Sequence, residues 1–265
     1  MPGVTTAVPG PAPRPRTRPQ SRIGWTVVLL SALAIAGSSL ALYAQSSLRA
    51  LAADDAGLAS AYADAPPAIQ AAFYVHVVSA SVALALGPWQ FSRRLRGRFR
   101  TAHRVIGRTY LGAIAVGAAS SLVMTPFNSA GLVGLFGFGA LALLWGYTAL
   151  RGYRAIRRGD LAGHQAWMIR NYALTYAAVT LRTWTGVLIT VQTPFAGAAA
   201  DADALFANAY HAVPFLCWLP NLVVAEWLIR RRGLPSYRLS AAPAAPMTPT
   251  APAGSGPAVP APAAG

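Results

Sequence analysis

The sequence predicts an all-α fold: a polytopic six-helix transmembrane bundle with both termini cytoplasmic. Two observations lead to this prediction, namely six long apolar runs and arginines that gather between alternate runs. The composition agrees, because only 11% of the 265 residues are charged, 55% are hydrophobic and the mean hydropathy is +0.42. Soluble chains average about 25% charged residues, so this composition excludes a disordered chain and argues against an ordinary soluble domain.

The six runs define the expected spans. A helix needs about 20 mostly apolar residues to cross a bilayer, and the runs that meet this length are 24–44, 70–91, 105–125, 131–150, 166–191 and 207–229. The first run is longer than the ~7–15 apolar residues of a signal peptide, so we interpret it as an uncleaved span. It shows no polar residue that would need burial, and we expect it to be peripheral.

The spans place one transmembrane domain at residues 23–232, between two tails. Residues 1–22 are rich in proline and arginine, and residues 233–265 are rich in alanine and proline. Neither tail has enough apolar surface to offset the entropy lost on ordering, so both are expected to be disordered and cytoplasmic.

The distribution of charge predicts the orientation. Most of the 22 basic residues lie before the first run, between the second and third, after the fourth and after the sixth. The opposite loops carry Arg49 and five acidic residues: Asp54, Asp55, Asp64, Asp201 and Asp203. The positive-inside rule therefore predicts a multi-pass protein of the cell membrane with the N-terminus and C-terminus in the cytoplasm.

The net charge of +15 follows from this topology. The arginines form no basic face on a soluble domain, so we expect no nucleic acid as a partner. Clusters of arginine at a cytoplasmic membrane surface instead predict contact with the anionic lipid of the bilayer.

The four histidines lie near the ends of the expected spans. His76 and His211 fall near the outer ends of the second and sixth spans, and His103 and His164 near the inner ends of the third and fifth. Imidazole is a common axial ligand of haem iron, and facing helices of a bundle build such sites. This predicts two haem b groups, one ligated by His103 and His164 and one by His76 and His211. The alternative is that the histidines are hydrogen-bonded interfacial residues that bind nothing.

Arg170, Arg182 and Glu226 lie within the expected spans, where ionisable groups mark functional sites by default. Arg182 follows His164 by about five helical turns on the same face, so it is expected near the outer histidines. There it would neutralise a haem propionate or an anionic substrate. Arg170 and Glu226 lie at like depths in the fifth and sixth spans, which predicts a structural ion pair between those helices.

The uncharged polar residues within the runs include Gln90, Asn171, Thr175 and Asn221. Such side chains form hydrogen bonds between transmembrane helices, or they line a polar path through the bundle. The single cysteine, Cys217, excludes an internal disulfide and a cysteine-based metal site.

These residues support two functional hypotheses, and they leave open whether the chain is an enzyme. The leading hypothesis is di-haem transmembrane electron transfer between a quinol or a cytoplasmic reductant and an acceptor, so a quinone or another electron-transfer protein would be a partner. The alternative is non-enzymatic: a small-solute or proton transporter, or a membrane assembly factor. In a transporter, Arg182 and the Arg170–Glu226 pair would form the gate of a polar bundle core.

Four segments carry a family resemblance: HVVSASVALALGPWQF (76–91), HRVIGRTYL (103–111), RAIRRGDLAGHQAWMIRNYALTYAAVTLR (154–182) and CWLPNLVVAE (217–226). Over roughly residues 70–230 the chain resembles a bacterial family of predicted integral membrane proteins, the domain of unknown function numbered twenty-three-oh-six. The resemblance implies a multi-span inner-membrane protein, and it implies no activity. Its segments include all the candidate residues above except His211, which falls just before the last segment.

Overall fold

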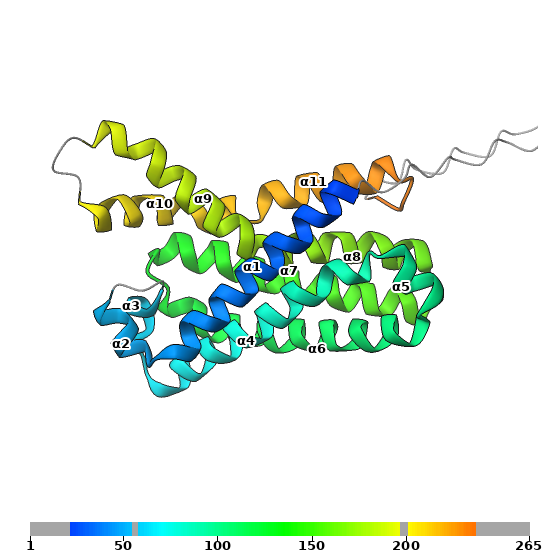
Figure 1. Ribbon diagram of the computed structural model, residues 1–265, viewed down its shortest axis with the longest axis horizontal. Helices are drawn as coiled ribbons and strands as arrows, with labels where there is room; N and C mark the ends of the chain where they lie inside the picture. The colour runs from blue at the N-terminus through cyan, green and yellow to red at the C-terminus, as the bar shows by residue number, and fades with distance from the viewer. Residues whose placement is uncertain (1–21, 55–57, 197–200, 237–265) are drawn as a thin grey trace, which may run out of the picture.

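The computed structural model describes residues 22–54, 58–196 and 201–236, and every regular element in these ranges is helical (Figure 1). The all-α prediction is therefore confirmed. The helices, in chain order, are α1 (Arg22–Gln45), α2 (Leu48–Ala53), α3 (Ala59–Tyr62), α4 (Pro67–Gln90), α5 (Arg93–Arg98), α6 (Arg100–Met124), α7 (Gly131–Arg157), α8 (Leu161–Thr175), α9 (Ala177–Gln192), α10 (Ala202–Leu216) and α11 (Leu219–Arg231). Two short 3₁₀ turns, η1 (Thr125–Phe127) and η2 (Thr193–Phe195), follow α6 and α9.

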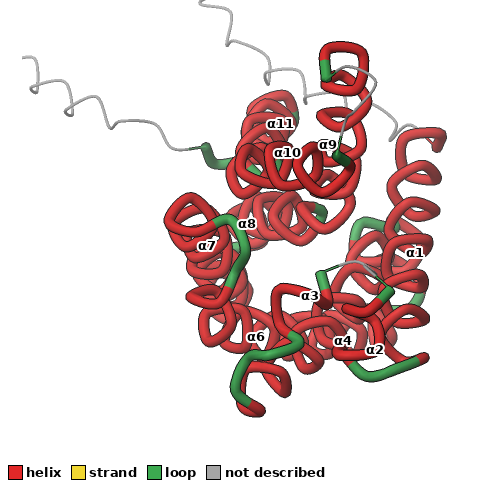
Figure 2. The backbone as a smooth tube through the Cα atoms, turned by 90° about the vertical axis from the view of Figure 1, so that its left-hand side faces the viewer, coloured by secondary structure: helices red, strands yellow, loops and turns green. Residues whose placement is uncertain are grey.

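Five helical segments in the described ranges are long and apolar enough to cross a membrane: Ile23–Gln45, Pro67–Gln90, Arg100–Phe127, Gly131–Arg157 and Ala202–Arg231. They correspond to the expected first, second, third, fourth and sixth spans. Seen along the bundle, α4, α6, α7 and α8 follow one another, and α1 stands beside α4 (Figure 2). This is the arrangement of a multi-pass membrane protein.

The two ends of the bundle differ in the elements they carry. The start of α1, the arginine-rich α5 and the end of α11 lie at one end, and α2 and α3 lie at the other (Figure 1). The first and last described residues thus share an end with α5, as the predicted topology requires. That this end faces the cytoplasm remains a prediction of the charge distribution.

The expected fifth span is not one continuous helix: α8 and α9 meet at Tyr176. A side chain takes part in the backbone hydrogen-bond ladder there: Nδ2 of Asn221 on α11 donates to the carbonyl oxygen of Ala173 at 3.1 Å. In an unbroken α-helix, that carbonyl accepts the N–H group four residues later. Insertion of a side chain into this ladder is a recognised cause of a kink.

The expected sixth span is also divided, into α10 and α11, at Cys217 and Trp218. Pro220 explains this break, because proline has no N–H to donate and its ring clashes with the carbonyl four residues earlier. Two side chains bond the carbonyl oxygen of Cys217 at this break: the Thr180 hydroxyl and Asn221 Nδ2, the latter at 3.0 Å. Asn221 Nδ2 also lies 3.0 Å from Thr180 Oγ1, so the same side chains join the two breaks.

Beyond these breaks, α9 and α10 form an antiparallel pair that diverges from the rest of the bundle (Figure 1). We call this pair the α9–α10 hairpin. Within it α9 packs chiefly on α10, whereas α10 also packs on α7. The hairpin is therefore attached to the bundle chiefly through α10 and through the two breaks, with a smaller contact of α9 on α1.

The contact between α10 and α7 depends on Gly137. A Cβ atom at this position would lie 2.5 Å from Cβ of Pro214 and 2.9 Å from its carbonyl carbon and oxygen. Backbone atoms cannot rotate away, so we expect Gly137→Ala to destabilise the protein by about 1–3 kcal/mol, the usual cost of overpacking. Thermal unfolding of the detergent-purified protein measures this.

Gly112→Ala is the matched control for that prediction. Gly112 lies within α6 and has no atom within 4 Å of its would-be Cβ. Alanine is a better helix former than glycine by about 1 kcal/mol, so this variant should melt at or above the wild-type temperature. Equal melting temperatures for Gly137→Ala and the wild type would contradict the close approach of α10 to α7.

Candidate functional site

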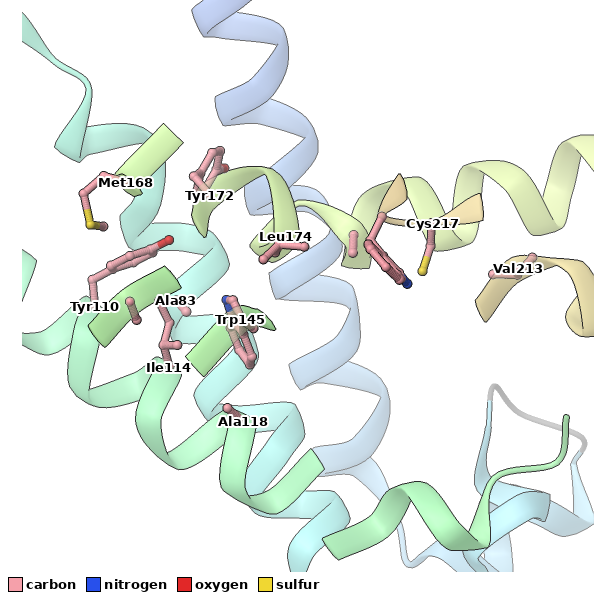
Figure 3. Packing of buried hydrophobic residues seen from close by; sticks show 13 residues of the cluster. Ala83, Tyr110, Ile114, Ala118, Trp145, Met168, Tyr172, Leu174, Val213 and Cys217 are labelled. Carbon is pink, nitrogen blue, oxygen red and sulfur yellow. The ribbon is translucent and has the colours of Figure 1, made fainter. Parts of the chain in front are cut away.

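A cavity of about 530 Å³ lies between α1, α4, α7, α9 and α10. Its volume falls within the ~300–1,000 Å³ of small-molecule sites. Apolar side chains form most of its wall, among them Ile35, Leu42, Phe73, Leu141 and Ile189. Trp145 and Leu174, which also line it, belong to the buried core that Tyr110, Ile114 and Ala118 of α6 complete (Figure 3).

Arg182 on α9 provides the positive charge of this cavity. Its Nη2 donates to Ser39 Oγ on α1, and its Nη1 donates to the carbonyl oxygen of Ala178, both at 2.8 Å. Tyr43 and Tyr210 line the same cavity as Arg182. No aspartate or glutamate lines the cavity, and within the described ranges the carboxylate partners of ion pairs belong to Arg49 and Arg170. The Arg182 charge thus has no acidic partner among the described residues.

His76 on α4 lines the same cavity. Its Nδ1 lies 3.0 Å from the carbonyl oxygen of Gly117 on α6, and its ring meets Trp145 edge-to-face with the centroids 6.3 Å apart. A carbonyl only accepts hydrogen bonds, so Nδ1 carries the proton and Nε2 of the neutral ring is left with a lone pair. Nε2 is therefore the nitrogen of His76 that can accept a proton or bind a metal.

The other outer histidine, His211, does not line this cavity. It is exposed on α10, and its Nδ1 lies 2.6 Å from the carbonyl oxygen of Ala207 in the same helix. The structure therefore does not bring His76 and His211 into one site. Of the four histidines, all of which are described, only His76 is a lining residue.

The two inner histidines lie at the end of the bundle that carries α5. His103 on α6 is close enough to His164 on α8 for their charges to interact. His164 Nδ1 lies 2.9 Å from the carbonyl oxygen of Gly152, whereas the buried Nδ1 of His103 has no hydrogen-bond partner. Each of these two rings has a nitrogen without a protein partner.

Arginines cluster beyond these histidines, outside the membrane-spanning segments. Partial burial lowers the pKa of Arg96, and the positive charges of Arg232 and Arg93 lower it further. Burial and then the charge of Arg93 likewise lower the pKa of Arg232. The last turn of chain after α11 thus lies near α5, and together they present a concentrated positive charge.

Arg170 and Glu226 are in contact, and they join α8 to α11. Arg170 Nε donates to Oε1 of Glu226, and Nη2 donates to Oε2 at 3.0 Å. The side chain of Arg170 is only 6% exposed and that of Glu226 29%. The guanidinium carbon of Arg170 also lies 4.8 Å from the centre of the Trp167 ring. Neither partner lines the cavity, so the pair is a clamp between helices at a separate place.

Asn171 and Thr175 form interhelical hydrogen bonds at the base of the cavity. The Tyr110 hydroxyl donates to Asn171 Oδ1 at 2.7 Å, and Asn171 Nδ2 lies 2.9 Å from both the carbonyl oxygen of Trp145 and Thr148 Oγ1. Trp145 Nε1 donates to Thr175 Oγ1 at 2.8 Å. These bonds connect α6, α7 and α8 and hold Trp145 in the cavity wall.

The first span is peripheral, as expected, because only 11% of it is buried against 33–39% of the other four, but the expectation that it has no buried polar residue was wrong. Ser39 of α1 is buried and bonds Arg182, and Tyr43 lies one helical turn further along in the same wall. Their spacing of four residues places them on one helix face. That spacing was visible in the sequence, but the partner on α9 was not.

The chain was compared with known families, curated proteins and solved structures. The model of a family described as "Predicted membrane protein (DUF2306)" matches residues 73–229, which run from α4 into α11. No curated protein and no solved structure matches the chain. The match includes His76 and Arg182, whereas α1 lies outside it.

Proposed function

Since this chain belongs to the predicted membrane protein family DUF2306, we propose that it is a membrane transporter that holds its solute in the cavity beside Arg182. The α9–α10 hairpin is the part that moves. The observation that carries this proposal is the position of the two helix breaks, because residues beside both of them line the cavity.

Broken helices at membrane depth have a specific physical cost. Backbone groups freed at a break are tolerated within a bilayer only where protein or a cavity covers them. In secondary transporters, such discontinuous helices line the substrate site. Here Thr175 and Ala177 flank the first break, Cys217 lies at the second, and all three line the cavity. Two neighbouring breaks at one cavity are the arrangement that substrate binding by discontinuous helices requires.

The same breaks supply hinges. Hinge motion is absorbed by a few residues at the ends of elements, and the α9–α10 hairpin joins the bundle through Tyr176 and through Cys217 and Trp218. The hairpin carries Arg182 and Tyr210 into the cavity wall. A rotation about these residues changes the opening of the cavity and moves its charged group at the same time.

Cys217, the only cysteine of the chain, provides the test. It is fully buried but lines the cavity, so a water-soluble thiol reagent reaches it only when the cavity opens. We expect a membrane-impermeant methanethiosulfonate to label Cys217 when it is added to either face of sealed, oriented vesicles, as alternating access requires. Labelling from one face only, or from neither, overturns the transport proposal.

The matched control moves the cysteine out of the cavity. Ala149 on α7 is buried within the core and is absent from the cavity wall. In the variant Cys217→Ser with Ala149→Cys, the impermeant reagent should label neither face, while the thiol reacts after denaturation. Labelling of this variant at the same rate would mean that the reagent reports general loosening rather than opening of the cavity.

Electron transfer through haem is the second candidate, and His76 is the residue that favours it. Metal-ligating imidazoles commonly donate their other N–H to a carbonyl, as His76 Nδ1 does to Gly117. With one imidazole in the cavity wall, this candidate places a single haem there, with a quinol as a chemically suitable donor. Absorption spectra of the purified oxidised and dithionite-reduced protein test it. A b-type α-band that His76→Ala removes supports haem, and no band in protein expressed with ample haem overturns it.

A further inference from the structure

From the chemistry of the cavity we infer a substrate class: an amphipathic organic anion with one acidic head group, a carboxylate or a phosphate, on an apolar body. Arg182 binds the head group, and the aliphatic and aromatic wall of α1, α4 and α7 encloses the body. The inference rests on the proposed function for the transport step, whereas binding itself is tested independently of transport.

The negative charge of the head group is inferred from the hydrogen bonds and the surroundings of Arg182. A guanidinium remains charged and has five N–H donors, and the structure engages only two of its nitrogens, with Ser39 Oγ and the carbonyl oxygen of Ala178. Both partners are neutral, and no carboxylate of the described residues lines the cavity. Placing an uncompensated charge at membrane depth is costly. An anion that accepts the remaining N–H groups supplies the missing charge, and carboxylate and phosphate match the planar guanidinium geometrically.

A second donor lies beside the guanidinium. The Tyr43 hydroxyl oxygen accepts the N–H of Leu58 at 3.0 Å, and the hydroxyl proton remains available to donate. Tyr43 and Arg182 both line the cavity, and Tyr43 lies one helical turn from Ser39, the residue that Arg182 contacts. An acidic head group at this position therefore meets N–H donors from α9 and an O–H donor from α1.

The apolar character of the ligand body is inferred from the volume and the lining of the cavity. The cavity of about 530 Å³ exceeds what an inorganic anion fills, and most of its lining atoms are apolar. A small anion would leave these surfaces without contacts, whereas an alkyl or aromatic body covers them and gains the free energy of apolar burial. A cationic amphiphile with the same apolar body is disfavoured, because the Arg182 guanidinium would repel its positive head group.

Binding of radiolabelled dodecanoate to the protein in nanodiscs, corrected for empty nanodiscs, tests this class. We expect saturable binding of one molecule per chain. Dodecanoate or dodecyl phosphate should compete for it, and the ratio of their affinities tells a carboxylate head from a phosphate head. Dodecyltrimethylammonium and dodecanol should compete at least about tenfold less well, the size of one charge-assisted contact. Equal competition by the cation overturns the inference.

Variants separate the Arg182 contact from general surface charge. Arg182→Gln should weaken dodecanoate binding at least about tenfold, and Arg182→Lys should retain part of the preference for an anion. Arg49→Gln is the control, because Arg49 is an exposed arginine outside the cavity. Elution as a monodisperse peak shows that each variant is folded. If Arg182→Gln and Arg49→Gln bind dodecanoate alike, the assignment is wrong.

The labelling of Cys217 distinguishes failure of this inference from failure of the transport proposal. Two-sided labelling without anion binding overturns the substrate class and leaves transport standing. Saturable anion binding with one-sided labelling supports the class and overturns transport, since the cavity is then a fixed binding site.

Discussion

Glu226→Ala is expected to destabilise the folded protein by about 3 kcal/mol, at the lower end of the cost of breaking a buried ion pair. The substitution removes both carboxylate oxygens that Arg170 contacts, and the Arg170 side chain is only 6% exposed in the intact protein. The cost arises mainly because the Arg170 guanidinium, which burial has already removed from water, also loses its carboxylate partner. Because the pair joins α8 to α11, the second consequence is weaker packing between these helices. Thermal unfolding of the purified protein, followed by tryptophan fluorescence, measures the loss.

Two further variants show whether burial is the cause. The double variant Arg170→Met with Glu226→Leu removes both charges and keeps the volume, so it should be more stable than Glu226→Ala alone. Asp64→Ala breaks the Arg49–Asp64 contact, whose side chains are 78% and 94% exposed, and such exposed pairs contribute little. A melting temperature for Glu226→Ala equal to that of Asp64→Ala would refute a stabilising role for the clamp.

Asn171→Ala is expected to cost at least about 2 kcal/mol, because three interhelical contacts of about 0.6 kcal/mol each are lost within a membrane bundle. Asn171 has no exposed surface, and its partners Tyr110, Trp145 and Thr148 belong to α6 and α7. The truncation also leaves a small void at the base of the cavity. Asn208→Ala, at an exposed position of α10, removes one side-chain bond, to Gln192 of α9, and should lower the unfolding temperature less. A similar temperature for both variants would show that the network contributes no more than that one bond.

The fold could be predicted from the sequence where length and hydropathy decide it. The second expected span, 70–91, differs from α4 (Pro67–Gln90) by only a few residues, because a bilayer sets the length of an apolar helix. The break before α11 also had a visible cause in Pro220. The break at Tyr176 had none, because the side chain that interrupts the ladder, Asn221, lies far along the sequence on another helix. A contact between distant segments leaves no local pattern.

The site was predictable only in part, and for a geometric reason. Sequence position gives the depth of a residue in the membrane. On that basis His76 and Arg182 were expected near each other, and both line one cavity. Depth does not tell which way a side chain points around its helix axis, or which neighbouring helix it faces. His211 therefore lies on α10 outside that cavity although its expected depth matches that of His76. Whether any histidine binds haem remains a prediction.

The cavity is built from two parts that the family match treats differently. The match begins at residue 73, so it includes the helices that carry His76 and Arg182 and leaves out α1 with Ser39 and Tyr43. Exchange of the first helix alone therefore alters the head-group contacts while every residue of the matched segment is retained. Under the proposed substrate class, α1 therefore contributes to the choice of head group from outside the matched segment, whereas the apolar wall from α4 and α7 lies within it.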